Sequence, residues 1–172
     1  MSSTANQQER LEVLKGWIVG FVDGEGCFCI SINKNPTNKI GWQVMPEFVV
    51  TQGEKSIEAL KTIQRFFNCG RIFINRRHDN HKENLYRYCI RSLQDLREKV
   101  IPFFEENRLR TSKREAFKQF SKVLKLMEKG THLKIEGIRK IAIMAQSINR
   151  QKTPKFLESS EAIRQTRQKL HI

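Results

Sequence analysis

Apolar residues recur along the chain with two different periods, and the change from one period to the other predicts the order of helices and strands. Spacings of three and four residues, typical of one face of a helix, occur in residues 7–23, 56–67, 93–98, 111–127, 133–148 and 159–170. Strict alternation, typical of half-buried strands, occurs in residues 26–33, 42–51, 71–75 and 85–91. The order helix-strand-strand-helix-strand-strand-helix predicts an α+β fold with antiparallel hairpins, followed by C-terminal helices.

The predicted strands have one apolar face each, which is typical of an antiparallel sheet that helices cover on one side. In the first strand Phe28, Ile30 and Ile32 share a face, and in the third strand Ile72 and Ile74 do. We therefore expect the opposite face of the sheet to be free for another molecule.

Three positions complicate this pattern. Residues 85–91 allow two facings, with Tyr86 and Tyr88 pointing inward or with a bulge that swaps the faces. Pro46 lies inside the second predicted strand and predicts a sheet edge or a bulge there. Pro102 predicts a turn after the helix of residues 93–98.

The length of 172 residues predicts one domain, 1–172, with a core of about residues 7–128 and C-terminal helices in about residues 131–172. The charge is strongly asymmetric, with 32 Lys and Arg against 18 Asp and Glu and a formal net charge of +14. Such a balance indicates a polyanionic partner. An apolar run of about 20 residues, which a membrane span needs, does not occur, so nucleic acid is favoured over a membrane.

Cysteine and histidine usage suggests no metal framework. The spacing of the cysteines fits neither a zinc finger nor a set of disulfides, and it predicts reduced thiols in an intracellular protein, at Cys27, Cys29, Cys69 and Cys89. The sequence His78-Asp79-Asn80-His81 has polar and charged neighbours on both sides and is expected to be a hairpin tip.

The end of the first predicted helix carries the most informative residues. Gly16 and Gly20 lie one turn apart on the same stripe, and each weakens a helix by about 0.5–1 kcal/mol relative to alanine, so something is expected to press closely against the backbone there. The sequence Asp23-Gly24-Glu25-Gly26 then holds two carboxylates in a flexible, glycine-rich segment that we expect to break the helix. Because hard divalent cations prefer oxygen ligands, this segment is a candidate metal site.

Residues 18–26, Ile-Val-Gly-Phe-Val-Asp-Gly-Glu-Gly, resemble the LAGLIDADG motif of homing endonucleases and intron maturases. The resemblance implies an αββαββα core whose antiparallel sheet binds DNA. It also implies that motif helices pack glycine against glycine across a twofold axis. Since this chain has one motif, the resemblance implies a homodimer with Gly16, Gly20 and Asp23 at its interface, acting on a long, nearly palindromic target.

Further roles follow from the resemblance residue by residue. It implies that Glu25 is the metal-binding carboxylate, that the Gly24 carbonyl lies near the metal, and that Asp23 mainly supports helix ends. Gln52 matches a glutamine that organises solvent around the scissile phosphate. The catalytic lysine corresponds to Lys113, with Arg110 as the alternative. The implied cofactor is Mg²⁺, with Mn²⁺ as a substitute.

The free face of the predicted sheet is expected to bind DNA, since a two-stranded ribbon fits the major groove. Polar side chains that can read base edges or phosphates are Ser31, Asn33, Lys34, Gln43, Glu47, Arg71, Asn75 and Arg77. Side chains that can touch thymine methyl groups are Cys29, Val49 and Phe73.

The sequence favours a homodimeric, metal-dependent, site-specific double-strand DNA endonuclease. Two alternatives remain open: an RNA maturase that assists its own intron on the same scaffold, and a DNA-binding regulator without a metal. If the protein is intron-encoded, as the resemblance implies, we expect a chloroplast or mitochondrial location.

Overall fold

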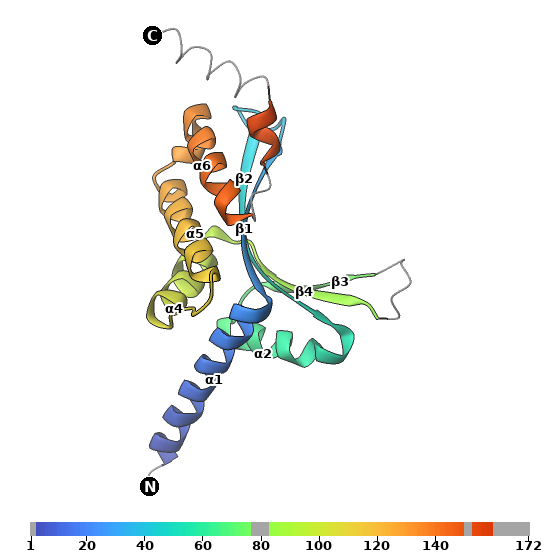
Figure 1. The fold of residues 1–172 in the computed structure, drawn as a ribbon, viewed down its shortest axis with the longest axis vertical. Helices are drawn as coiled ribbons and strands as arrows, with labels where there is room; N and C mark the ends of the chain where they lie inside the picture. Colours follow the sequence, from blue (N-terminus) through green and yellow to red (C-terminus); the bar gives the residue numbers. More distant parts are fainter. Residues whose placement is uncertain (1–2, 77–82, 150–152, 160–172) are drawn as a thin grey trace. The chain divides into compact units, whose positions relative to one another are not determined.

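The computed structural model describes residues 3–76, 83–149 and 153–159, and Figure 1 shows its helices and strands. The chain forms two compact units. The first unit comprises Met1–Cys27 and Phe48–Arg114, and the second comprises Phe28–Glu47 and Glu115–Ile172. The expected hairpin tip with His78 and His81, the DNA contact at Arg77 and the helix of residues 159–170 fall mostly or wholly outside the described residues.

Four strands form one sheet, as the alternating pattern predicts: β1 (Gly26–Lys34), β2 (Trp42–Gly53), β3 (Arg71–Asn75) and β4 (Leu85–Ile90). Their order is β1-β2-β4-β3, and β4 is antiparallel to both β2 and β3. The α+β class with an antiparallel sheet is therefore confirmed.

Pro46 does not lie on an edge strand, because β2 has neighbours on both sides. The pairing of β2 with β4 begins only at Phe48, two residues after the proline. A proline nitrogen cannot donate to a sheet ladder. Pro46 is therefore compatible with an interior strand since it lies beyond the segment that β4 pairs with.

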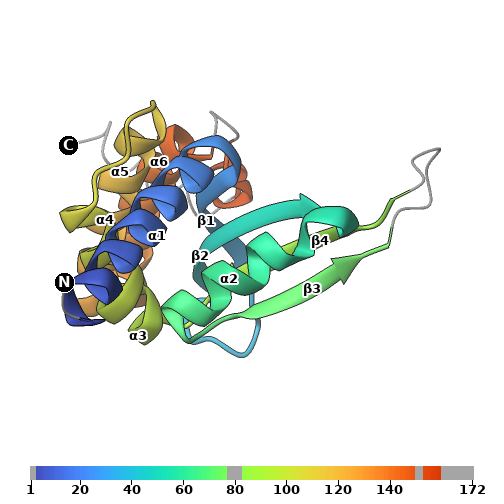
Figure 2. The same ribbon diagram turned by 90° about the horizontal axis from the view of Figure 1, so that it is seen from below.

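In the first unit, α2 (Ile57–Phe67) covers one face of the sheet and lies along β3 and β4 (Figure 2). Its apolar stripe of Leu60, Ile63 and Phe67 is buried, as predicted. The ring centroids of Phe67 and Phe48 lie 6.0 Å apart. Burial of a large aromatic side chain contributes roughly 1.5–3 kcal/mol, so the burial of Phe67 helps to hold the helix on the sheet.

The register of β4 decides its facing. Tyr88 lies opposite Val50 and Ile72, and the tyrosine ring is fully buried on the face that α2 covers. The inward facing of Tyr88 is therefore correct, and Arg87 belongs to the opposite face. The expectation that Ile74 is buried is wrong, because it is 46% exposed near the end of the edge strand β3.

The predicted turn at Pro102 is also wrong, because helix continues through it. The helical segment consists of α3 (Leu93–Asp95), a π-helical turn η2 (Leu96–Val100) and α4 (Ile101–Glu106). Proline in a regular helix clashes with the carbonyl four residues earlier. Here the wider π turn ends at Val100, two residues before Pro102, and it gives the ring a place without ending the helix.

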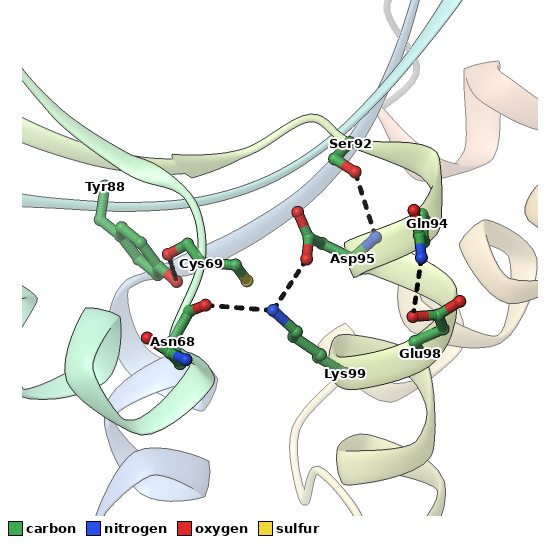
Figure 3. Close-up of polar contacts among 8 residues, drawn as sticks. All are labelled: Asn68, Cys69, Tyr88, Ser92, Gln94, Asp95, Glu98 and Lys99. Carbon is green, nitrogen blue, oxygen red and sulfur yellow. Dashed lines mark hydrogen bonds and ion pairs between the residues drawn. The ribbon is translucent and has the colours of Figure 1, made fainter.

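A polar cluster connects the end of α2 to this helical segment (Figure 3). Lys99 Nζ donates to the carbonyl oxygen of Asn68 at 3.0 Å and pairs with Asp95 at 2.9 Å. Asn68 is the left-handed C-cap of α2. The Tyr88 hydroxyl donates to the Cys69 carbonyl at 3.0 Å, and burial raises the pKa of this tyrosine, so it stays a neutral donor. The cluster thus holds α2 in place at its C-terminal end.

The first helix, α1 (Ser3–Glu25), continues two residues beyond the predicted end, so Asp23 and Gly24 are helical rather than helix-breaking. Ile18 and Val22 form its buried face. β1 begins directly at Gly26. This abrupt change from helix to strand places Glu25 at the very end of α1.

Gly26 allows this abrupt junction. A Cβ atom at this position would lie 2.6 Å from Val22 Cγ1 and 2.8 Å from the Val22 carbonyl oxygen. We expect Gly26→Ala to lower the free energy of unfolding by about 1–3 kcal/mol, because the backbone must move. Gly24→Ala is the matched control for stability, since no described atom beyond the adjacent backbone lies within 4 Å of its Cβ position. Urea unfolding of both variants tests this; equal stabilities would contradict it.

In the second unit, helices pack against the part of the sheet formed by β1 and the first half of β2. They are α5 (Lys113–Glu128), which begins in the first unit, a short η3 (Thr131–Leu133), α6 (Ile135–Ile148) and η4 (Lys155–Glu158). The Phe28 ring lies 5.2 Å from Phe117 and 5.4 Å from Phe120. Phe28, Ile30 and Ile32 are all buried, as predicted.

Asn149 completes the outer edge of β1. Its side-chain Oδ1 accepts the Ile30 backbone N–H at 3.1 Å, and its Nδ2 donates to the Ile30 carbonyl at 2.7 Å. The amide thereby imitates one residue of a neighbouring strand. Unpaired edge groups invite pairing with other chains, so this contact also protects the edge.

Candidate active site and nucleic-acid interface

The C-terminal end of α1 brings Asp23, Gly24 and Glu25 to the start of α5. Lys113 Nζ donates to the Asp23 carbonyl oxygen at 2.8 Å and to the Gly24 carbonyl oxygen at 2.6 Å. The last carbonyl groups of a helix have no intrahelical partner and carry a partial negative charge. The ammonium group therefore stands where a cation is favoured. It contacts the carbonyl of Gly24, the residue that precedes the exposed Glu25.

Asp23 acts on the other side of the same junction. Its carboxylate accepts the Arg110 N–H at 2.6 Å, the Thr111 N–H at 3.2 Å and the Thr111 hydroxyl at 2.7 Å. Thr111 Oγ1 in turn accepts the Lys113 N–H at 3.3 Å. Partial burial works to raise the pKa of Asp23, but these hydrogen bonds and the charge of Lys113 outweigh it, and the pKa is lowered.

This shift predicts a pH-dependent stability. We expect Asp23→Asn to lower the free energy of unfolding by about 1 kcal/mol at neutral pH, the usual size of a helix-cap effect, since solvent screens much of the charge. A depressed pKa contributes stability above the ordinary value of 3.8, and that stability is lost as the pH falls through the lower folded value. The difference between wild type and Asp23→Asn should therefore shrink below about pH 4. Urea unfolding between pH 3 and pH 7 measures it; a constant difference would argue against the assignment.

The donor set at the end of α1 fits a hard divalent cation. Glu25 supplies an exposed carboxylate, Gly24 supplies a main-chain carbonyl, and the Lys113 ammonium shows that this carbonyl attracts positive charge. No group of three His, Cys, Asp or Glu side chains in residues 3–76, 83–149 and 153–159 comes together as a metal site. The described part of one chain thus offers only a partial set of carboxylates.

Gln52 lies near the end of β2, opposite Tyr86 in the register, and it is half-buried. The next residues turn into the short helix η1 (Glu54–Ser56) that leads into α2. The Glu83 carboxylate accepts the Lys55 N–H at 2.7 Å and holds this turn. Arg110, the alternative to Lys113, is exposed, and its described contact with the motif is through its backbone N–H.

Gly16 and Gly20 are open in the single chain. Apart from the glycine itself, its chain neighbours and the adjacent backbone of α1, no described heavy atom lies within 4 Å of a Cβ atom placed at either glycine. Trp17 lies on the same helix with 39% exposure and packs against Phe21 at a centroid distance of 5.0 Å. Val13 is 69% exposed. The helix thus carries an apolar surface with a flat glycine stripe.

In the second unit, the predicted DNA contacts of β1 and β2 divide into two groups. The group on the open face of the ribbon is Cys29, Ser31, Asn33, Gln43 and Glu47. Within it, the Cys29 thiol donates to the Glu47 carbonyl at 3.5 Å and lies 3.7 Å from the Glu47 carboxylate. Lys34 lies apart from this group, because its ammonium stands 5.7 Å from the ring centre of Trp42, which belongs to the buried face.

In the first unit, the sheet register brings the other predicted contacts onto one face. Arg71 shares a row with Val49 and Cys89, and Phe73 shares the next row with Thr51 and Arg87. Asn75 is exposed at the end of β3. Val49 is only 6% exposed, so little of its side chain can touch a ligand.

Two further arginines lie on this face, although the sequence did not predict them as DNA contacts. Arg87 lies directly opposite Phe73, and the Arg91 guanidinium lies 5.7 Å from the Phe73 ring centre. The signal for them is the alternation of residues 85–91, which places both arginines on the face opposite Tyr88. It could not be used because the facing of this strand was ambiguous from sequence alone.

The described residues combine an antiparallel sheet, which carries Arg71, Arg87 and Arg91 on one face, with a helix, α1, that ends in the exposed Glu25. Residues 18–124 match the family model described as LAGLIDADG endonuclease, and the chain belongs to this family. Among the residues that the structure describes, no helix is long and apolar enough to cross a membrane.

Similar curated proteins carry endonuclease names. "Probable intron-encoded endonuclease 2" of Neurospora crassa is 34% identical over 134 residues, which are 77% of this chain and 28% of that protein. "DNA endonuclease I-CeuI" of Chlamydomonas moewusii is 34% identical over 127 residues, 72% of this chain and 56% of that protein. The chain therefore spans about a quarter to a half of these relatives.

Solved structures share the fold. The homing endonuclease I-TnaI superposes with a TM-score of 0.75 at 39% identity, over 87% of this chain and 97% of that one. The LAGLIDADG homing endonuclease I-LtrWI bound to target DNA superposes with a TM-score of 0.74 at 28% identity, over 80% of this chain and 45% of that one.

Proposed function

We propose that this chain is a site-specific DNA homing endonuclease that acts as a homodimer and hydrolyses phosphodiester bonds in both strands with a divalent metal ion. The observation that carries the proposal is the end of α1, where the exposed Glu25 carboxylate follows a Gly24 carbonyl that already attracts a cation. The match of residues 18–124 to the endonuclease family supports the same reaction.

Each residue of the site has a distinct task in this proposal. Glu25 and the Gly24 carbonyl hold the metal ion, Mg²⁺ or in its place Mn²⁺; a similar structure, of I-SmaMI, is described as bound to uncleaved DNA in the presence of calcium ions. When bound, the ion supplies charge neutralisation at the phosphate and lowers the pKa of the attacking water. Lys113 neutralises charge that develops on the phosphoryl oxygens. Gln52 orients solvent beside the scissile phosphate through its side-chain amide.

A second copy of the chain would complete the site. Two Glu25 carboxylates brought together at a twofold axis repel each other, and a divalent cation relieves this repulsion. The open stripe at Gly16 and Gly20 offers a surface for close helix packing. The DNA-bound I-LtrWI chain is about twice as long as the segment that matches, which supports an assembly of two such units. Twofold symmetry predicts a nearly palindromic target.

The open faces of the sheet strands are proposed to lie in the major groove, with side chains contacting base edges and phosphates. The net charge of +14 supports a strong phosphate contribution. Each neutralised phosphate releases counterions, so binding should weaken steeply as salt is added.

Arg87 and Arg91 should both contribute to this binding. We expect Arg87→Ala and Arg91→Ala each to weaken DNA binding and to reduce the slope of log affinity against log salt by about 1, if each contacts one phosphate. Arg65→Ala is the control, because Arg65 is exposed on α2, the helix on the opposite face. Fluorescence anisotropy at several salt concentrations measures the slope. Equal slopes for the two variants and the Arg65→Ala control would contradict the role of these arginines.

The maturase alternative is not favoured, because the matching family and the similar proteins reported above are named for DNA cleavage. The name "intron-encoded" of the Neurospora relative supports an intron origin for this chain, and with it an organellar location.

The proposed function is tested by incubating the purified protein and Mg²⁺ with a randomised duplex library and sequencing the cut ends. We expect one nearly palindromic site to be enriched and cut in both strands, and no cutting in EDTA. Binding of one site in EDTA with no cutting after Mg²⁺ is added would instead identify a DNA-binding regulator.

A further inference from the structure

The Lys113 ammonium occupies the Gly24 carbonyl, which the proposed function assigns to the divalent ion. The last four carbonyls of a helix lack intrahelical partners, and in α1 two of them, at Asp23 and Gly24, receive the Lys113 ammonium at 2.8 and 2.6 Å. These are short, charge-assisted hydrogen bonds. The single chain thus compensates the negative end of α1 with its own cation.

The position of Lys113 is set by the backbone around it. The Asp23 carboxylate binds Arg110 and Thr111 just before α5, and Thr111 Oγ1 accepts the Lys113 N–H. The lysine backbone is therefore tied to the same helix end that its ammonium contacts. Only the side chain needs to rotate for the ammonium to leave the carbonyls.

A divalent ion at Gly24 and the ammonium on the same carbonyl would be like charges within a few ångströms. Such charges repel strongly at a partly buried site. The two cations therefore compete for the oxygen atoms at the end of α1.

We propose that the Lys113 ammonium occupies the cation site at the end of α1 in the metal-free protein, and that a divalent metal ion displaces it. In the metal-free protein the ammonium stabilises the end of α1 and keeps the carbonyls in place. When the metal binds, the ammonium leaves Gly24 and becomes available to the phosphate. The inference rests on the proposed function, and it couples the release of Lys113 to metal loading.

The first test measures metal affinity without cleavage. Lys113→Met removes the charge and keeps a long side chain, and Lys118→Met is the control, because Lys118 pairs with Glu115 on the exposed surface of α5. Titration with Mn²⁺, followed by electron paramagnetic resonance, should show about tenfold tighter binding to Lys113→Met than to wild type. In EDTA the same variant should unfold at a lower temperature. Unchanged or weaker Mn²⁺ binding to Lys113→Met would overturn the proposal.

The second test separates displacement from simple charge repulsion. The hydrogens of the Lys113 ammonium, observed through its ¹⁵N resonance, should exchange slowly with water in EDTA and rapidly at saturating Mg²⁺. Protection that persists at saturation would show that Lys113 is a permanent cap of α1, even if the protein cleaves DNA, and only this inference would fail. If wild-type protein neither binds Mn²⁺ nor cuts the library, the inference and the proposed function both fail.

Discussion

Glu25→Gln should abolish DNA cleavage, with a loss of about 10³-fold or more in rate, because each chain contributes a single exposed carboxylate at the end of α1. Glutamine has nearly the same shape, but its neutral amide binds a divalent cation far less well than a carboxylate does. The folded chain should not suffer, since the side chain is exposed. DNA binding should remain, and it should become slightly tighter as a negative charge near the phosphates is lost.

Cleavage of the selected duplex with Mg²⁺ and gel-shift binding in EDTA measure the two effects. Glu58→Gln serves as the control, because Glu58 is an exposed acid on α2 that pairs with Lys61. The rate with Glu58→Gln should match that of wild type. If Glu25→Gln cut DNA at a normal rate, the assignment of the metal site would fail.

Gly20→Leu should prevent the close helix packing that the proposed homodimer requires. Beyond the adjacent backbone of α1, the structure places no described atom within 4 Å of the Cβ position, so the isolated chain can accept leucine. Leucine also has a higher helix propensity than glycine by about 0.5–1 kcal/mol. In a dimer, however, two leucines would meet at the axis, and overpacking at about 1–3 kcal/mol per site should weaken association roughly 100-fold or more.

Analytical ultracentrifugation of the free protein measures association, and a cleavage assay reports nicks against double-strand breaks. Gln7→Leu is a matched control, because position 7 is an exposed site of α1 about half a turn around the helix from Gly16. We expect the control to remain dimeric and active, and Gly20→Leu to be monomeric, folded and inactive. A dimeric, fully active Gly20→Leu variant would show that the glycine stripe is not part of the interface.

Local patterns predicted most of the secondary structure, because burial of one face imposes a short period on the sequence. The alternation of Phe28, Ile30 and Ile32 located β1, and the stripe of Leu60, Ile63 and Phe67 located α2. The error at Pro102 has a physical reason. A π-helical turn before the proline depends on packing around the helix, which no propensity describes.

The candidate site was predictable only in part. The motif residues were found because their chemistry is unusual in a chain with a net charge of +14. The contact between Lys113 and Gly24 joins residues 89 positions apart, so local spacing in the sequence could not predict it. Arg87 and Arg91 were missed because their facing depends on the register of β4 against β2 and β3.

The sequence by itself determined the order of the elements, the family motif and the preference for a polyanionic partner. These properties rest on residue type and short spacing, which survive without any long-range contact. Only the tertiary structure decided which carbonyls receive the Lys113 ammonium, which face of the sheet carries Arg87, and how Pro46 and Pro102 are accommodated. Those outcomes depend on contacts between segments that are far apart in the sequence, and local periodicity contains no information on such contacts.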